Sequence, residues 1–358
     1  MTNTQFQSYW INNWIAIFAF SIAFSACDAT KHESRNLYFI RAPEAVELDL
    51  KFVLSFGVDF DDSLSNSKPL SRISQIQLSD NKLFVLDRGF KEVIVFDNDS
   101  GNWSGLSFGS YGRGPGEFIL PLAMDISDNK IFVYDYELRN VNIFNSSGEL
   151  IMTNYLPIST KDIIVKGDTL FASLMSSRFH HASSFLIQRE GEEMLKLYDH
   201  IPLTATDSLF NPDGLVNWID KHESGDVVIG SERPGVFYVQ NSNEDFSEKG
   251  SYLMNSIEGL TEMGIYNTRA STIGIEVANG RVYSVVQNHH SIKINPTPIE
   301  GYYLEIFSLS GEHLGYAKLP HSWISTFTVD PTGDYLYLAI TDPFPQIMKY
   351  RILGLPND

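Results

Sequence analysis

Residues 79–87 read SDNKLFVLD, and residues 127–135, which begin 48 positions further on, read SDNKIFVYD. The register continues into the following strand, because Phe96 is answered by Phe144 after the same interval. A repeat of this length, filled with short alternating strands and tight turns, is typical of one blade of a β-propeller. The repeat therefore predicts an all-β ring in which each blade is a small antiparallel sheet.

Period-2 alternation of apolar and polar residues divides the rest of the chain into further blades. The first blade is expected to hold strands at 73–79, 82–88, 92–97 and 104–109. The next four blades are expected at 119–157, 160–202, 214–255 and 270–320. The last blade offers only three strands, at 324–329, 335–340 and 346–352.

The missing strand of the last blade is expected from the N-terminal end of the chain. Residues 53–57, VLSFG, resemble residues 105–109, GLSFG, which form the fourth strand of the first blade. Pairing of the two chain ends would remove the exposed strand edges that invite aggregation. We therefore predict a six-bladed β-propeller of four-stranded antiparallel blades, with the N-terminal strand completing the last blade.

The composition fits one large β domain and excludes some partners. The chain is 43% hydrophobic and 13% aromatic, which supplies a large core. Its formal net charge of −18 argues against a nucleic-acid partner, because phosphate binding needs a basic surface. The chain has one cysteine, so neither an internal disulfide nor a cysteine-based zinc site can form. We expect a monomer.

The single cysteine, Cys27, follows an apolar run at 15–24 that has the length of a signal-peptide core. The residues FSAC at 24–27 resemble a bacterial lipobox, which implies lipidation of Cys27 and a lipid anchor in the membrane. The alternative is an ordinary secretory leader that is cut nearby. The expected organisation is a lipoprotein signal peptide at 1–26, a polar tether at 27–45 and the propeller at 46–358. The expected location is the cell envelope, as an outer-membrane lipoprotein on either the periplasmic or the surface face.

The connection at 108–118, FGSYGRGPGEF, strongly resembles the linker between blades of NHL-repeat propellers. Residues 135–144, DYELRNVNIF, resemble the same repeats in the spacing of Asp, Arg and Phe. Together with the lipobox, the chain resembles the six-bladed β-propeller lipoproteins of Gram-negative bacteria, in the NHL-repeat and TolB-like propeller group. The resemblance implies a fold and a location, and it carries no active site.

Arginines are expected to gather on one rim of the ring. The strand order of a propeller places the loops between second and third strands, and the connections between blades, on the same face. Seven of the twelve arginines fall in these places and are the candidate ligand-binding residues: Arg72, Arg88, Arg113, Arg139, Arg178, Arg233 and Arg269. They could bind an anionic glycan or peptide, or an envelope protein. Alternatively, each arginine pairs with a neighbouring acid such as Asp87 or Asp135.

Metal chemistry has weaker candidates. The pairs His180, His181 and His289, His290 fall in loops of two blades and could converge on a transition metal. Adjacent residues of a strand point in opposite directions, so one histidine of each pair would face away. The acidic turns Asp59-Asp61-Asp62 and Asp97-Asp99 could capture Ca²⁺ but look like solvated turns. We predict no cofactor.

The one G-x-S-x-G pattern, GLSFG at 105–109, falls within an expected strand and not in the strand-to-helix turn of a nucleophile elbow, so the leading expectation is a binding or scaffolding module without catalysis. The alternative is a propeller enzyme, such as a lyase, lactonase or hydrolase, with a polar and metal-assisted centre. Converging acids or histidines around the axis would favour the enzyme, and Gln75, Met124, Asn217 and Thr326 leave this open. Trp103, Trp218 and Trp323 could stack on sugars, although we expect core positions for them.

Overall fold

The computed structural model describes parts of the unit that spans Tyr38–Asp358. The described residues are 44–57, 67–156, 159–167, 169–174, 184–189, 196–199, 217–222, 226–231, 236–240, 250–254, 268–290 and 301–355. Cys27 and the expected leader and tether up to residue 43 lie outside the described residues. Among the described residues, no helix has the length and hydropathy needed to cross a membrane.

The first two blades are the two copies of the 48-residue repeat. Blade one consists of β3 (Ile73–Ser79), β4 (Lys82–Asp87), β5 (Glu92–Asp97) and β6 (Trp103–Phe108). Blade two consists of β7 (Pro121–Ser127), β8 (Lys130–Asp135), β9 (Asn140–Asn145) and β10 (Leu150–Tyr155). Each strand pairs antiparallel with the next.

A local conformation explains why Asp-Asn recurs in the repeat. Asp80 and Asn81 have φ values of 48° and 57°, and Asp128 and Asn129 have 50° and 59°. A two-residue hairpin turn with both central residues at positive φ favours asparagine, aspartate and glycine. The repeated pair therefore fixes the register between the first and second strands of both blades.

Blades three and four have the same plan. Blade three consists of β11 (Thr160–Lys166), β12 (Thr169–Leu174), β13 (Ser184–Arg189) and β14 (Lys196–Asp199). Blade four consists of β15 (Asn217–Lys221), β16 (Val227–Ser231), β17 (Val236–Gln240) and β18 (Gly250–Met254). The blades expected at 160–202 and 214–255 are thus present.

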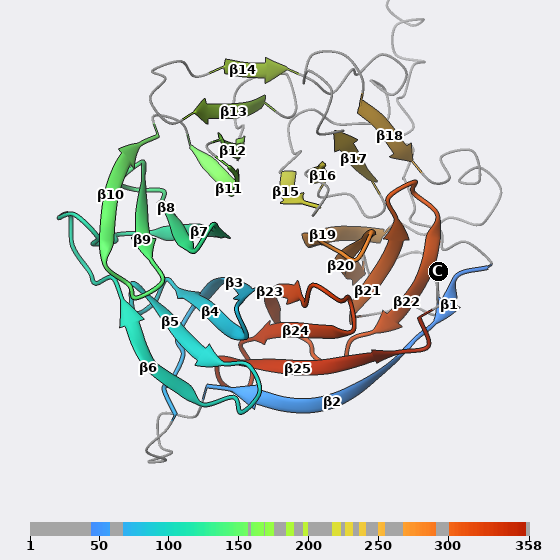
Figure 1. Ribbon diagram of the computed structural model, residues 1–358. Coiled ribbons are helices and arrows are strands. Elements are labelled where there is room, and N and C mark those ends of the chain that lie inside the picture. The colour runs from blue at the N-terminus through green and yellow to red at the C-terminus, as the bar shows by residue number, and fades with distance from the viewer. Residues whose placement is uncertain are drawn as a thin grey trace, which may run out of the picture. The chain divides into compact units, whose positions relative to one another are not determined.

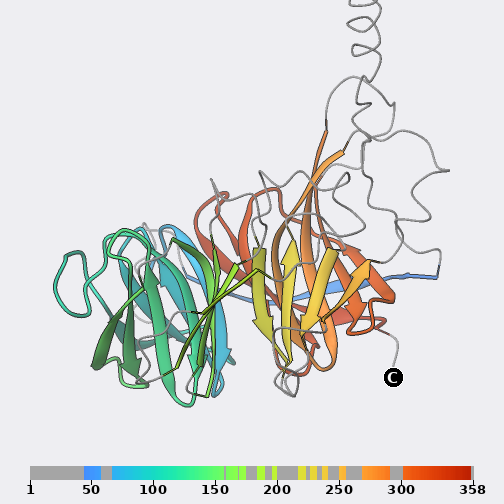
Figure 2. The same cartoon turned by 90° about the horizontal axis from the view of Figure 1, so that it is seen from above.

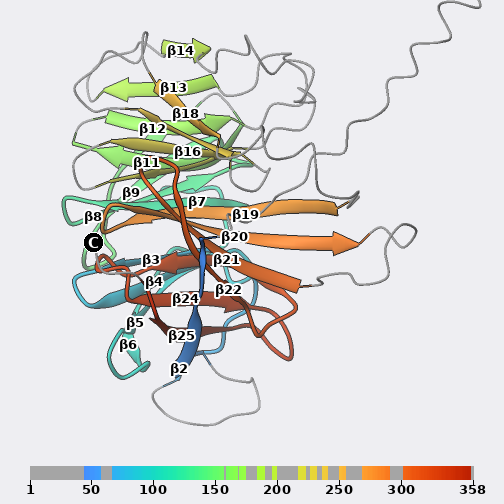
Figure 3. The same cartoon turned by 90° about the vertical axis from the view of Figure 1, so that its right-hand side faces the viewer.

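Blade five has one strand more than expected. It consists of β19 (Thr268–Ala278), β20 (Arg281–His290), β21 (Gly301–Ser308) and β22 (His313–Lys318), and Figure 3 shows β19 and β20 projecting beyond the other strands. The short strand β1 (Val46–Glu47) pairs in parallel with β22 and adds a fifth strand. The buried side chain of Leu48 packs against the core between blades five and six.

Blade six closes the ring as predicted. It consists of β23 (Ile324–Val329), β24 (Tyr335–Ile340), β25 (Gln346–Leu353) and the N-terminal β2 (Asp49–Phe56). β2 pairs antiparallel with β25, from Asp49 opposite Leu353 to Phe56 opposite Ile347. The two ends of the propeller chain therefore lie in one sheet.

The six blades form a closed ring around an axis. Figure 1 looks along this axis and shows the first strand of each blade at the centre, and Figure 2 shows the strands running between the two ends of the ring. Each innermost strand contacts the next, and β23 contacts β3. Separate apolar layers fill the spaces between neighbouring blades, as Ile76 and Val85 of blade one pack with Tyr337 of blade six. The protein is therefore a six-bladed β-propeller.

Candidate functional site

The innermost strands bring polar side chains together around the axis. We call this group the axial cluster. Its members are Gln75 and Gln77 of β3, Asp125 of β7, Asp162 of β11, Asp220 and Lys221 of β15, Glu276 of β19 and Thr328 of β23. Asp125, Asp162 and Thr328 are buried, and the other members of the cluster are half-buried.

The backbone of the innermost strands explains why polar side chains are needed there. Such a strand pairs on one edge only, so amide groups on its axial edge lack a partner within the sheet. An oxygen acceptor from one blade binds a backbone N–H of the next blade at four successive steps. The donor–acceptor pairs are Met124 N with Gln75 Oε1 (2.5 Å), Val165 N with Asp125 Oδ2 (2.5 Å), Ile219 N with Asp162 Oδ2 (3.3 Å) and Val277 N with Asp220 Oδ2 (2.5 Å).

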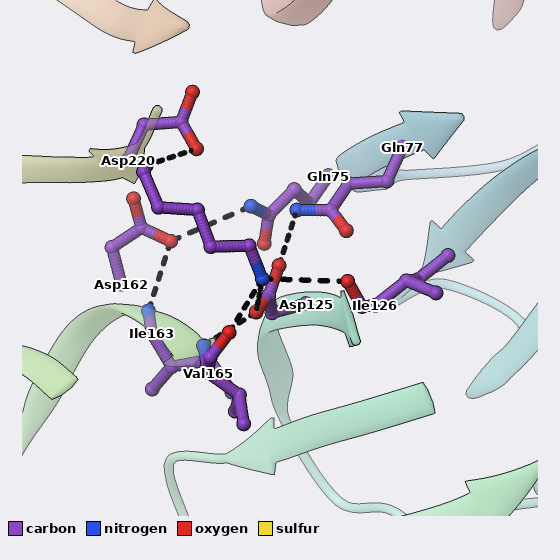
Figure 4. Close-up of polar contacts among 9 residues, drawn as sticks. Gln75, Gln77, Asp125, Ile126, Asp162, Ile163, Val165 and Asp220 are labelled. Carbon is purple, nitrogen blue, oxygen red and sulfur yellow. Dashed lines mark hydrogen bonds and ion pairs between the residues drawn. The ribbon is translucent and has the colours of Figure 1, made fainter. Parts of the chain in front are cut away.

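A lysine crosses the centre of the cluster. The Lys221 ammonium of blade four lies 2.7 Å from the Asp125 carboxylate of blade two. It also donates to the carbonyl oxygens of Val165 at 2.6 Å and Ile126 at 3.4 Å. Figure 4 shows Asp125, Val165 and Ile126 close together, with dashed lines for these contacts. One side chain therefore connects three blades.

A second cross-connection involves the glutamines of blade one. The Gln75 amide donates to Asp162 Oδ1 of blade three at 3.4 Å, and the Gln77 amide donates to Asp125 at the same distance (Figure 4). The other oxygen of Asp162 accepts the Ile219 amide of blade four. The Asp162 carboxylate is therefore held by groups from two other blades.

Three of the axial carboxyl groups bind protons more tightly than usual. Burial is the main cause, and it raises the pKa of Asp162 to about 7 and that of Asp220 to about 7, with further upward contributions from the nearby charge of Asp125. Burial and the neighbouring Asp220 raise the pKa of Glu276 well above its ordinary value. Glu276 accepts a hydrogen bond of 3.0 Å from the Thr328 hydroxyl of blade six. At neutral pH these groups can therefore carry protons.

The cluster is suited to holding blades together. Four of its acceptors, on Gln75, Asp125, Asp162 and Asp220, each bind a backbone amide of the next blade. Within the described residues, no three His, Cys, Asp or Glu side chains are grouped so as to hold a metal ion. The carboxyl groups of Asp162 and Asp220, with pKa values of about 7, could also donate a proton as general acids.

The seven candidate arginines fall into two groups. Arg72, Arg88, Arg113 and Arg139 are described, and all four side chains are exposed. Arg178 and Arg233 lie outside the described residues, and Arg269 lies in β19 with a side chain that is not described. The side chains of the four candidate histidines are not described either. His180 and His181 lie outside the described residues, and only the backbone of His289 and His290 in β20 is described.

Backbone hydrogen bonds show which loop positions are equivalent in different blades. Arg88 N donates to Arg72 O at 2.8 Å, joining the turn after β4 to the connection before β3. The same bond joins Tyr136 to Leu120 in blade two and Thr341 to Trp323 in blade six, at 3.0 and 3.1 Å. The counterpart of Arg88 in blade two is thus Tyr136. Arg139 corresponds to Lys91, since both have positive φ in the same turn.

Asp87 and Asp135 do not pair with these arginines. Both carboxylates are fully buried and bind backbone amides, which for Asp135 are those of Ile119, Leu120 and Leu138 at 2.7–2.8 Å. Asp87 accepts from Ser71, Arg72, Gly89 and Phe90. Among the described residues, none of the four exposed guanidinium groups forms an ion pair within 4.0 Å. The alternative of arginine–aspartate pairing is therefore wrong at these positions.

The three tryptophans differ in exposure. Trp103 is half-buried, donates to Leu106 O at 3.1 Å and lies under the Lys68 ammonium. Trp218 is also half-buried, with the Lys161 ammonium 4.1 Å from its ring centre. Trp323 is 61% exposed, so the core position expected for it is wrong.

The acidic turn at 97–99 is built from internal hydrogen bonds. Asp97 Oδ1 accepts hydrogen bonds from the hydroxyl and the backbone amide of Ser100, which lower the pKa of Asp97. Asp99 accepts from the Asn81 amide at 2.8 Å. Asp59, Asp61 and Asp62 lie outside the described residues.

Comparison with known proteins supports the fold. A family model, DUF5128, described as a 6-bladed beta-propeller, matches residues 63–211. A DUF4221 family member from Bacteroides vulgatus is similar in structure, with a TM-score of 0.56, 14% identity, and coverage of 87% of this chain and 99% of that chain. A "Putative exported protein" from Bacteroides fragilis gives a TM-score of 0.52 at 13% identity, over 89% and 98% of the two chains.

A third similar structure is regucalcin from Agrobacterium tumefaciens, described as a calcium-binding protein. Its TM-score is 0.52 at 10% identity, over 87% of this chain and 97% of that chain. At these identities the likenesses show the propeller fold alone. No curated protein matches this sequence.

Proposed function

We propose that this protein is a lipid-anchored, non-enzymatic propeller of the cell envelope that binds an anionic ligand through one face of the ring. We call this the arginine face and define it by the exposed side chains of Arg72, Arg88, Arg113 and Arg139. The proposal includes a signal peptide at 1–26, lipidation at Cys27 and a tether to residue 45. The ligand would be an acidic glycan or peptide, or an acidic surface of an envelope protein.

The exposed arginines carry the binding proposal. The protein has a formal net charge of −18, so exposed cations would be expected to find acidic partners readily. Yet the two adjacent acids, Asp87 and Asp135, are buried and engaged by backbone amides. The N–H donors of these planar guanidinium groups can therefore bind a ligand. A guanidinium group binds a carboxylate or sulfate group through two parallel hydrogen bonds.

The envelope address is supported by the sequence. Residues 24–27 resemble a lipobox after an apolar run, and the Bacteroides fragilis structure with the same fold is described as exported. The connection at 108–118 supports placement in the NHL-repeat and TolB-like group of lipoprotein propellers. Replacing Cys27 with serine should move the protein from the membrane fraction to the soluble fraction of lysed cells. Retention of Cys27→Ser in membranes would contradict lipid anchoring.

An enzyme is the second candidate, and the axial carboxyl groups favour it. Asp162, Asp220 and Glu276 have raised pKa values, which suits general acids. Binding is favoured over catalysis because Asp162 and Asp220 already accept backbone amides of the next blade. Glu276 is the group to test, since within the described parts of the chain its carboxylate accepts from the Thr328 hydroxyl and from no backbone amide. Turnover of lactones or esters that is lost in Glu276→Gln would support the enzyme instead.

The binding proposal is tested with two anionic probes, polygalacturonate and poly-L-glutamate, and with dextran as a neutral probe. Replacing Arg72, Arg88, Arg113 and Arg139 with glutamine should weaken binding to at least one anionic probe by tenfold or more. The matched control replaces Lys51, Lys82, Lys130 and Arg351, which are exposed elsewhere, with glutamine. It changes the net charge equally and should change affinity by less than twofold. Equal losses in both variants, or no binding of either anion, would overturn the proposal.

A further inference from the structure

The arginine face also carries exposed aromatic rings. Tyr111 is 73% exposed in the connection from blade one to blade two, and Trp323 is 61% exposed in the connection from blade five to blade six. Both connections lead into an innermost strand. Since strands alternate in direction, these connections lie at the same end of the ring as the turns that hold Arg88 and Arg139. Blades six, one and two are neighbours through contacts of β23 with β3 and of β3 with β7.

Trp323 and Arg72 occupy equivalent places in blades six and one. The carbonyl of each accepts the amide of the residue that follows the second strand, Thr341 or Arg88. An exposed indole in one blade is therefore matched by an exposed guanidinium in the next. Arg113 lies two residues after Tyr111 and adds an exposed cation to the same loop.

The backbone that carries Tyr111 and Arg113 is held firmly. Phe118 N donates to Ser110 O at 2.8 Å, and Gly112 N donates to Phe118 O at 3.2 Å. The Glu117 carboxylate accepts the Gly114 amide at 2.6 Å and occupies the space beside Gly112, where a Cβ would lie 1.9 Å from it. The loop thus displays its two outward side chains from a fixed frame, which reduces the entropy lost on binding.

The arrangement favours a carbohydrate over a protein partner. The other exposed large hydrophobic side chains among the described residues lie on strands β1, β2, β10 and β25. In the described loops of the arginine face, Tyr111 and Trp323 are the two exposed large hydrophobic side chains, and they belong to different connections. A protein interface needs a contiguous apolar centre, whereas a sugar ring presents a C–H face that packs on a single aromatic ring.

Resting on the proposed function, we infer that the ligand of the arginine face is an acidic polysaccharide. Trp323 and Tyr111 would stack on sugar rings, and Arg72, Arg88, Arg113 and Arg139 would bind their carboxylate or sulfate groups. A polysaccharide consists of many linked sugars, so it can extend across blades six, one and two. Each acidic sugar offers an apolar ring face to an aromatic side chain and an anionic group to an arginine.

The test compares probes that share charge but differ in the presence of sugar. The full chain, purified from membranes in detergent, is titrated with polygalacturonate, poly-L-glutamate and dextran. The double variant Trp323→Ala, Tyr111→Ala should weaken polygalacturonate binding by tenfold or more and leave binding of poly-L-glutamate within twofold. Trp323→Phe with Tyr111→Phe should retain most of the affinity. Phe52→Ala, which removes a half-exposed ring from an outer strand, is the matched control and should have no effect.

Each outcome bears on one of the two proposals. The polysaccharide inference is overturned if the aromatic variants bind polygalacturonate as the unmodified protein does. The anion-binding proposal still holds in that case if the arginine variant loses poly-L-glutamate binding. Equal binding of dextran and polygalacturonate overturns the acidic character of the ligand. Failure of both anions to bind overturns both proposals. Unchanged thermal unfolding of the variants shows that loss of fold does not cause the result.

Discussion

The Lys221 ammonium lies 2.7 Å from the Asp125 carboxylate, although the two residues belong to blades four and two. The intervening blade three contributes Val165, whose carbonyl accepts from the same ammonium and whose amide donates to the same carboxylate. The ion pair is largely withdrawn from solvent, with the Asp125 side chain 4% exposed. This link fastens three successive blades at their axial edges, where sheet hydrogen bonding is incomplete.

We therefore predict that Lys221→Met destabilises the propeller by about 3 kcal/mol, because removing one partner leaves a buried and unpaired carboxylate. The measurement is the free energy of unfolding from urea titration. Adding Asp125→Asn to this variant should recover part of the loss, since the uncompensated charge is then gone. Additive losses in the double variant would contradict the account.

The axial carboxyl groups predict a stability that rises on mild acidification. Burial raises the folded-state pKa of Asp162 from 3.8 to about 7, so the folded protein holds a proton that the unfolded chain releases. The contribution of Asp162 to the free energy of unfolding is fully present below about pH 4, and it is lost as the pH rises through about 7. For Asp162 alone the loss between pH 5 and pH 8 is on the order of 2 kcal/mol.

Urea unfolding at pH 5 and pH 8 checks this expectation. Asp162→Asn should flatten the pH dependence, because an amide does not titrate. Asp99→Asn, in a turn near the surface, serves as the control and should leave the difference between the two pH values unchanged. A protein that is more stable at pH 8 than at pH 5 would count against raised pKa values in the axial cluster.

The buried aspartates that end the second strands, Asp87 and Asp135, should be more sensitive to substitution than their surface neighbours. Asp135 accepts backbone amides of Ile119, Leu120 and Leu138, so it joins the connection between blades to the following turn. Asp135→Asn places an amide NH₂ against donors and should cost about 1–3 kcal/mol. Asp128→Asn, in an exposed turn at positive φ that asparagine tolerates, should be close to neutral by thermal unfolding. Similar effects of the two substitutions would refute the role assigned to Asp135.

The repeat predicted the blades well because strand alternation and turn residues act locally. The two-residue turns at 80–81 and 128–129 require positive φ, and the Asp-Asn pairs that tolerate this conformation are visible in the sequence. The closure by β2 could also be predicted, since an orphan strand at one end matched a missing strand at the other. The parallel strand β1 could not be predicted, because two residues carry no periodic pattern.

The axial cluster was hidden for a different reason. Asp125, Asp162 and Asp220 each stand beside apolar residues inside an innermost strand, which is the only local sign that they are buried. Their partners are backbone amides 40 to 57 residues away, as from Asp125 to Val165 and from Asp220 to Val277. Nearly every residue has the same backbone amide, so the sequence does not show which amide an acid binds. The blade that each acid contacts is determined only when the ring is closed. The exposure of Trp323 likewise depends on the position of its connection at the end of the ring.

Closure of the ring yields the last prediction, through two phenylalanines of β2. Phe56 is fully buried between blades six and one, with ring centres 6.0 Å from Phe96 and 6.1 Å from Tyr337. Phe52, four residues earlier on the same strand, is 50% exposed and contacts the ring of Tyr350 edge-on. Phe56→Ala should cost about 3–5 kcal/mol, because it leaves a cavity where the two chain ends meet.

Phe52→Ala removes the same side chain from the same strand and should cost about 1 kcal/mol or less, since only an edge contact is lost. Both values are measurable by urea unfolding. Limited proteolysis adds a local reading, because loosening of β2 should expose the N-terminal strand to cleavage in Phe56→Ala but not in Phe52→Ala. Equal stability of the two variants would mean that the ring does not depend on the packing of β2 between its first and last blades.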